Sequence, residues 1–135
     1  MNIEKSICII DDDKVYTYML KKMIQKLGTC QTIVNYTNGL DALESIKKSI
    51  AENDTNVLPD IIFLDINMPV MNGWQFLEAY SEIHSKIAKK IQIYQTSSSV
   101  NQADIDKSLG YHVVTKYIVK SMDINTLKSL VMCAN

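Results

Sequence analysis

The fold is decided by one stretch, Ile61-Ile-Phe-Leu-Asp65-Ile-Asn67-Met-Pro69-Val-Met-Asn72-Gly73. Its four successive apolar residues, bounded by turn-forming residues, are typical of a strand covered on both faces, as in a parallel sheet. Asp65 would lie at the carboxyl end of that strand, which is the edge where open α/β sheets bind their ligands. The stretch by itself predicts either a reactive carboxylate or a simple acidic strand cap.

Short apolar runs alternate with helical periodicities along the rest of the chain. Strands are expected at 6–10, 31–35, 61–65, 91–95 and 113–119, and helices at 15–27, 40–50, 73–87, 105–109 and 124–131. This fivefold alternation predicts an α/β fold with a parallel sheet and helices on both faces. Right-handed crossovers leave few topologies, of which the flavodoxin-like strand order 2-1-3-4-5 is the economical one.

The first expected helix is marked by apolar residues at helical spacing. Val15, Met19, Met23 and Leu27 recur at helical spacing, with Leu20 and Ile24 beside them. We expect this set to mark the packed side of the helix, and its lysines to mark the solvated side.

Length and composition indicate one domain, covering residues 1–135. An apolar content of 47%, a charged content of 21% and a net charge of −1 are ordinary for a soluble protein and give no electrostatic reason for nucleic-acid or membrane binding. The N-terminal residues resemble neither a signal peptide nor a membrane span, so we expect a cytoplasmic location. Cys8, Cys30 and Cys133 are widely spaced and odd in number, which favours core or helix-surface thiols over metal ligands or disulfides.

Chemically active side chains follow four of the expected strands. They are Asp11 and Asp12 after the first, Asp65 after the third, Ser97 after the fourth and Lys120 after the fifth. In the expected strand order these ends meet at one edge of the sheet. Crowded carboxylates require a cation, and Mg²⁺ suits them because it prefers oxygen ligands. A carboxylate can also attack phosphorus, and the metal, Lys120 and Ser97 could neutralise the transferred group.

At this point the chain resembles a known family, the receiver domains of two-component response regulators, over essentially its whole length. The motifs that carry the resemblance are Ile9-Ile10-Asp11-Asp12-Asp13, Leu64-Asp65-Ile66-Asn67-Met68-Pro69-Val70-Met71-Asn72-Gly73, Thr96-Ser97-Ser98 and Tyr117-Ile118-Val119-Lys120. The polar insert around 53–56 and the serine run are most similar to single-domain receivers of the phytochrome-associated kind.

The resemblance implies a role for each matching residue. Asp65 would be the phosphoacceptor, Asp11 and Asp12 the acidic pair with Asp12 a direct metal ligand, Asn67 a metal ligand through its backbone carbonyl, Ser97 the switch hydroxyl, Tyr117 the switch aromatic and Lys120 the invariant lysine. The implied phosphodonor is a sensor histidine kinase or a phosphotransfer protein. The implied output is binding to an unidentified protein or phosphorylation-dependent homodimerisation of a monomer. The domain would catalyse only its own phosphoryl transfer and dephosphorylation.

The chain departs from the family pattern at one position and leaves a second assignment open. Ser121 follows Lys120, where the family has a proline usually joined by a cis bond, so the sequence leaves open whether this bond is cis and how Lys120 is aimed. A one-residue slip would also make Thr96 the switch hydroxyl in place of Ser97.

Two other functions fit parts of the sequence. Asp11-x-Asp13-x-Val15 also resembles the nucleophile motif of haloacid-dehalogenase-type phosphatases. Those enzymes need a hairpin flap after that motif and an acidic pair after the lysine, whereas here a helical pattern follows directly and only Asp123 lies beyond Lys120. The third interpretation keeps the receiver fold as a phosphorylation-independent binding module.

Overall fold

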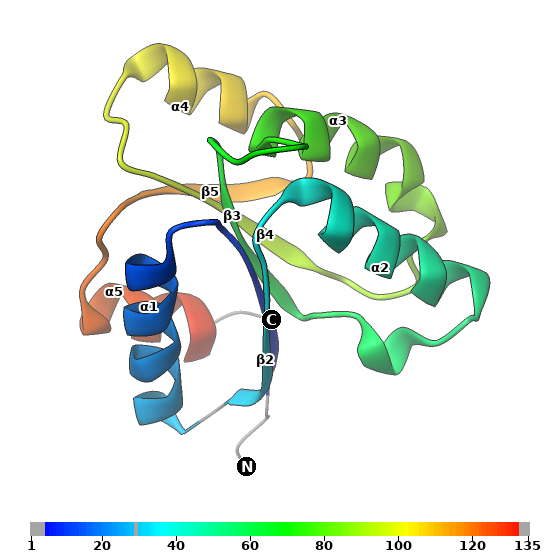
Figure 1. The fold of residues 1–135 in the computed structure, drawn as a ribbon, viewed down its shortest axis with the longest axis horizontal. Coiled ribbons are helices and arrows are strands. Elements are labelled where there is room, and N and C mark those ends of the chain that lie inside the picture. Colours follow the sequence, from blue (N-terminus) through cyan, green and yellow to red (C-terminus); the bar gives the residue numbers. More distant parts are fainter. Residues whose placement is uncertain (1–4, 29, 133–135) are drawn as a thin grey trace.

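A computed structural model describes residues 5–28 and 30–132 and has a five-stranded parallel sheet as its centre (Figure 1). The strands are β1 Lys5–Ile10, β2 Cys30–Tyr36, β3 Ile61–Asp65, β4 Gln92–Ser97 and β5 Val114–Val119. The helices are α1 Lys14–Leu27, α2 Gly39–Ala51, α3 Gly73–Ile83, α4 Gln102–Leu109 and α5 Ile124–Met132, with short 3₁₀ turns at Thr55–Val57 and His84–Lys86. The strand order is β2-β1-β3-β4-β5 and every neighbouring pair is parallel, which confirms the flavodoxin-like prediction.

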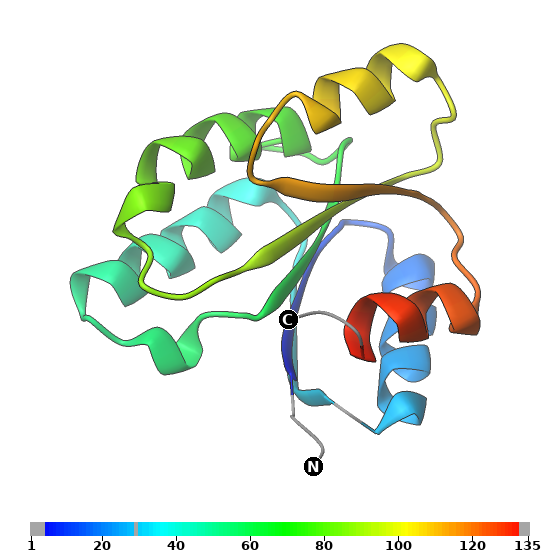
Figure 2. The same ribbon diagram turned by 180° about the vertical axis from the view of Figure 1, so that it is seen from behind.

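Helices cover both faces of the sheet, as Figures 1 and 2 show from opposite sides. Helices α1 and α5 lie on one face, and α2, α3 and α4 on the other. Because successive strand residues point to opposite faces, each central strand contributes side chains to two hydrophobic cores. Ile7, Ile9, Ile61 and Phe63 pack on the α1/α5 side, and Cys8, Ile10, Ile62 and Leu64 on the opposite side. All five residues of β3 are buried, as the apolar run predicted.

The face assigned to helix α1 from its sequence is right for Leu20 and Ile24, and for Met23 and Leu27, which pack against the same core, but it is wrong at two positions. Val15 is 71% exposed and Met19 is 59% exposed, whereas Thr17, Leu20 and Ile24 are the buried residues of the helix. Both Val15 and Thr17 lie at helical spacing from the apolar residues of the helix, and contact with the sheet decides which of them is buried. The packed side therefore includes a threonine that the apolar pattern did not mark.

Two smaller differences concern the segments after α2 and α3. The polar insert around 53–56 overlaps the 3₁₀ turn Thr55–Val57. Helix α3 ends at Ile83, and Ile87 follows the second 3₁₀ turn instead of belonging to the helix. Neither difference moves a strand end.

The cysteine predictions can be followed only in part. Cys8 is buried in the core, and its burial raises the pKa of the thiol to about 12, which keeps it protonated and unreactive. Cys30 begins β2, and Cys133 lies outside the described residues. Among those described residues, no helix is both long and apolar enough to cross a bilayer.

Candidate functional site: an acidic cluster with a lysine at the edge of the sheet

Asp11 is fixed through both its backbone and its side chain. It directly follows β1, and its N–H donates to the carbonyl of Tyr36 at the end of β2 (2.9 Å). Its Oδ1 accepts a hydrogen bond from the N–H of Asp13 (2.9 Å), and the residue is only 1% exposed. Asp13 in turn caps helix α1, because its Oδ1 accepts from the N–H of Tyr16 (3.0 Å). The start of α1 is therefore tied directly to the Asp11 carboxylate.

Asp65 is the last residue of β3, and the loop behind it folds back on the strand. The N–H of Gly73 donates to the carbonyl of Ile66 (2.7 Å). A Cβ atom on Gly73 would overlap the backbone carbonyl of Asp65, so only glycine permits this approach. Asn72 and Gln75 then form a reciprocal capping box that starts α3 (2.9 Å each). The turn residues of the deciding stretch thus hold Asp65 at the sheet edge.

Lys120 reaches into the same edge from the end of β5. Its Nζ lies 2.7 Å from Asp11 Oδ2 and 3.4 Å from Asp65 Oδ1. The N–H of Lys120 donates to the carbonyl of Ser97 (2.8 Å), which joins the ends of β4 and β5. The Lys120–Ser121 peptide bond is cis. The sequence left open how Lys120 is aimed, and the structure shows its side chain directed at both Asp11 and Asp65.

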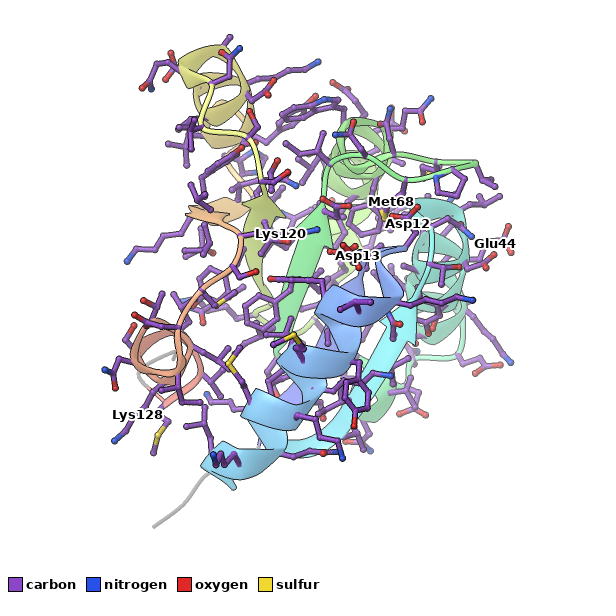
Figure 3. All side chains as sticks on the ribbon, turned by 60° about the vertical axis from the view of Figure 1, so that its left-hand side comes forward. Asp12, Asp13, Glu44, Met68, Lys120 and Lys128 are labelled. Atoms are coloured by element: carbon purple, nitrogen blue, oxygen red, sulfur yellow. The ribbon has the colours of Figure 1, made fainter. Side chains whose placement is uncertain are left out.

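Three carboxylates form a candidate metal centre beside this lysine. One oxygen atom from each of Asp11, Asp12 and Asp65 lies within 4.8 Å of the others. Asp11 and Asp65 are buried and Asp12 is exposed, so the cluster opens to solvent on one side. Figure 3 shows Asp12 and Asp13 close to Lys120 at the top of α1, with Glu44 and Lys128 at the periphery. The donor set and its access to water fit Mg²⁺.

The predicted backbone ligand Asn67 lies two residues beyond Asp65 in this loop, and it is exposed. Its part in metal binding stays a prediction.

The charges in this cluster shift the pKa values of both central groups. Burial raises the pKa of Asp65 to about 6, helped by the negative charge of Asp11 and opposed by Lys120. Burial alone would lower the pKa of Lys120, but its hydrogen bond to Asp11 and the charges of Asp65 and Asp11 outweigh this, so the pKa is raised. At neutral pH, the site therefore holds an ionised Asp65 next to a firmly protonated lysine.

Of the predicted switch residues, Ser97 is the last residue of β4 and Tyr117 lies within β5. Ser97 is 3% exposed, and its Oγ accepts from the N–H of Ser99 (3.0 Å). The hydroxyl of Tyr117 donates to the carbonyl of Ser99 (2.9 Å). Thr96, the alternative switch hydroxyl, is also buried, at 1% exposed. Ser97 and Tyr117 are thus both hydrogen-bonded to Ser99. Their role as switch residues stays a prediction.

The sequence interpretation missed one residue of the site, Tyr16. The Nζ atom of Lys120 lies 4.4 Å from the centroid of the Tyr16 ring. Burial, with the charges of Asp11 and Asp65, raises the pKa of the Tyr16 phenol. The available signal was its spacing from Leu20 and Ile24, four and eight residues later, which places it on the packed side of α1 just after the acidic pair.

Comparisons with known proteins identify the family. A family model described as response regulator receiver domain matches residues 7–132. The chemotaxis protein CheY of Thermotoga maritima is 33% identical over 105 residues, which cover 78% of this chain and 77% of that protein. The Regulator of RpoS of Escherichia coli K12 is 30% identical over 129 residues, or 96% of this chain. That alignment spans only 34% of the relative, so this chain matches about a third of its length.

Solved structures agree with this assignment. A two-component response regulator from Cytophaga hutchinsonii superposes with a TM-score of 0.83 at 26% identity, covering 95% of this chain and 94% of that one. The phosphorylated cyanobacterial phytochrome response regulator RcpA shares the fold, with a TM-score of 0.73 at 23% identity, covering 98% of this chain and 96% of that one. The chain therefore belongs to the response regulator receiver domains, the phosphoacceptor modules of two-component signalling.

Proposed function

We propose that Asp65 accepts a phosphoryl group from a phosphohistidine of a sensor kinase or phosphotransfer protein. The observation that carries the proposal is the meeting of Asp11, Asp12, Asp65 and Lys120 at the carboxyl edge of the sheet. In the strand order, β3 with Asp65 lies between β1, which leads to the acidic pair, and β5, which leads to Lys120. The surroundings of Asp65 raise its pKa to about 6, so it is mostly ionised and nucleophilic at neutral pH.

The transfer forms one bond and breaks one bond. A carboxylate oxygen of Asp65 attacks the phosphorus, the P–N bond of the phosphohistidine breaks, and its electron pair returns to the imidazole nitrogen, which can then take a proton from solvent. Lys120, already 3.4 Å from Asp65 Oδ1, would donate to an oxygen of the arriving group. Ser97, at the end of the neighbouring strand, supplies a second donor.

Asp11, Asp12, Asp65 and the backbone carbonyl of Asn67 would hold Mg²⁺ at this edge. A bound Mg²⁺ supplies positive charge for the oxygens of the transferred group. The protein must keep the carboxylates of Asp11 and Asp65 close together although they repel each other, and Lys120 does this in its two ion pairs.

The intact mass of the protein after incubation with acetyl phosphate and Mg²⁺ tests this proposal. Wild type should gain one phosphoryl group, Asp65→Asn should gain none, and chelation of Mg²⁺ should prevent the gain. Asp60→Asn is a matched control, because Asp60 is also paired with a lysine, Lys89 (3.2 Å), but lies at the opposite end of β3. Equal labelling of wild type and Asp65→Asn, or labelling that survives chelation, would reject the assignment.

We further propose that the phosphorylated domain signals by protein binding or homodimerisation through α4, β5 and α5. Leu109, Val119 and Ile124 on these elements are 51%, 41% and 37% exposed, and Tyr117 lies on the middle one. Sedimentation with and without beryllofluoride, a phosphoryl mimic, tests self-association, and pull-downs with wild type and Tyr117→Ala test partner capture. If neither depends on beryllofluoride, this output surface is rejected in favour of a role as a relay intermediate.

The phosphatase alternative is disfavoured by the start of α1. Asp13, the second acid of that resemblance, caps the helix that begins at Lys14, which leaves no room for a hairpin flap after β1. The binding-module alternative keeps the fold but predicts that partner binding does not depend on phosphorylation. Pull-downs that capture the same partner with and without beryllofluoride would support it, and beryllofluoride-dependent capture would reject it.

A further inference from the structure

Tyr16 lies against the reactive lysine, although none of the roles above uses it. Its ring centroid is 4.4 Å from Lys120 Nζ. Two hydrogen bonds fix its backbone to the acidic cluster: the N–H of Tyr16 donates to Asp13 Oδ1 (3.0 Å), and the N–H of Asp13 donates to Asp11 Oδ1 (2.9 Å). The ring is therefore held at a defined place relative to the acid that pairs with Lys120.

Among the described residues, the ammonium group of Lys120 contacts two carboxylates and one aromatic ring. Asp11 and Asp65 attract it as charges, at 2.7 and 3.4 Å, and the ring of Tyr16 attracts it through its π face. The Lys120 side chain is only 13% exposed, so little water competes for the ammonium. A lysine has a long flexible stem, and without a third contact its head could swing within this pocket.

We propose that Tyr16 is a positioning residue that holds the Lys120 ammonium toward the phosphoryl oxygens during transfer to Asp65. The inference rests on the proposed function of Asp65. Phosphorylation changes the charge that Asp65 presents to Lys120, while Asp11, the nearer acid, continues to draw the ammonium away. Attraction to the ring is independent of the charge state of Asp65, so the ring can restrain the lysine before, during and after transfer.

The geometry assigns this role to the ring and not to the hydroxyl. The Tyr16 hydroxyl is buried next to the hydroxyl of Thr96, and among the described residues neither has a hydrogen-bond partner of good geometry. Removing the Tyr16 hydroxyl therefore takes away only this poorly aligned contact with Thr96 and leaves the ring in place. A phenylalanine at this position should therefore keep the function of Tyr16, whereas an aliphatic residue should lose it.

Phosphorylation by acetyl phosphate with Mg²⁺ measures the effect without a partner protein. We expect Tyr16→Leu and Tyr16→Met to be labelled about tenfold more slowly than wild type, and Tyr16→Phe to stay within about twofold. Tyr18→Leu is the matched control, because Tyr18 lies on the same helix with Lys22 Nζ 5.5 Å from its ring but is 62% exposed. The control should be labelled like wild type.

A second measurement detects the contact directly. Ring current should shift the NMR resonances of the Lys120 methylene protons next to Nζ upfield in wild type and Tyr16→Phe, but not in Tyr16→Leu or Tyr16→Met. Rates of the two aliphatic variants equal to wild type, an equal loss of rate in Tyr16→Phe, or an unshifted Lys120 in wild type would each overturn the role of Tyr16. Absence of labelling in wild type would instead overturn the proposed function, and this inference with it.

Discussion

The two halves of the site are held together by different interactions. In the acidic half, comprising Asp11, Asp12, Asp65 and Lys120, the contacts at 2.7 and 3.4 Å join full charges. In the hydroxyl half, comprising Thr96, Ser97, Ser99 and Tyr117, the contacts between its own members, at 3.0 and 2.9 Å, join neutral groups. Both halves lie at the same edge of one sheet, and the backbone bond from Lys120 to Ser97 links them.

This difference separates chemistry from response. Removing one partner of a buried ion pair costs several kcal/mol, whereas a neutral hydrogen bond contributes about 1 kcal/mol net. Allosteric coupling typically amounts to about 1–3 kcal/mol, which is enough to exchange neutral hydrogen bonds but not to dismantle the charged cluster. A phosphoryl group can therefore leave the acidic half in place while it rearranges the hydroxyl half.

Lys120→Met should have the largest effect, because it leaves Asp11 and Asp65 facing each other without a cation. We expect about a hundredfold slower labelling by acetyl phosphate. We also expect the free energy of unfolding at pH 7 in chelator to fall by about 2 kcal/mol, as measured by urea titration. Mg²⁺ should restore part of this loss, since it replaces the missing charge. Lys116→Met is the control, because Lys116 is an exposed lysine on β5, the strand that leads to Lys120. Equal effects of the two substitutions would contradict the proposed difference between the two halves.

Asp65→Asn should have a smaller effect on stability and of the opposite sign. The folded-state pKa of Asp65 is about 6, above its ordinary value of 3.8, so folding favours the protonated form. Its contribution to stability is fully present below pH 3.8 and is lost as the pH rises through about 6. Asp65→Asn should therefore raise the free energy of unfolding at pH 7 in chelator by about 1 kcal/mol, after allowance for solvent screening.

The pH dependence provides the control for this prediction. In chelator, the stabilisation by Asp65→Asn should shrink as the pH falls from 7 toward 4, because wild-type Asp65 becomes protonated over that range. A stabilisation that does not change with pH would mean that the charge of Asp65 is not its cause.

Ser97→Ala tests whether the hydroxyl half transmits the signal. The variant loses the acceptor of the Ser99 N–H and one donor to the transferred group but leaves the acidic half intact, so it should still be labelled on Asp65, only more slowly. It should lose most of the amide chemical-shift change that beryllofluoride causes along residues 100–120 in wild type. Thr96→Val is the matched control, and it tests whether Thr96 is the switch hydroxyl in place of Ser97, which the sequence left open. A full wild-type response in Ser97→Ala would reject Ser97 as the switch.

The acidic half could be predicted from sequence for a simple physical reason. Apolar runs that end in Asp11 and Asp65 mark buried strands, and parallel strands place their carboxyl ends together. The location of Lys120 followed from the same rule. The direction of the Lys120 side chain could not be predicted in this way, because Ser121 replaces the proline of the family pattern. Only the structure gives the cis bond.

Helix α1 shows where this reasoning ends. Val15 and Tyr16 are neighbours on an apolar-rich helix, and helical spacing fits both of the faces that they define. Packing against the sheet chooses Tyr16, which makes Val15 71% exposed and brings an aromatic ring to Lys120. A contact that depends on one residue of helix rotation cannot be read from periodicity alone.

Tyr117→Phe should have the smallest effect and so gives the sharpest measure of the hydroxyl half. The substitution removes one neutral hydrogen bond, to the carbonyl of Ser99 (2.9 Å), and keeps the ring. We expect the free energy of unfolding in urea to fall by about 0.5 kcal/mol, because this hydrogen bond is only part-buried, with no change in the labelling rate. Tyr111→Phe, which removes an exposed hydrogen bond to Glu78 (2.7 Å), is the control and should cost less. If Tyr117→Phe destabilised the protein as much as Lys120→Met, or slowed labelling as strongly, the two halves would not differ in strength and the proposed separation of chemistry from response would fail.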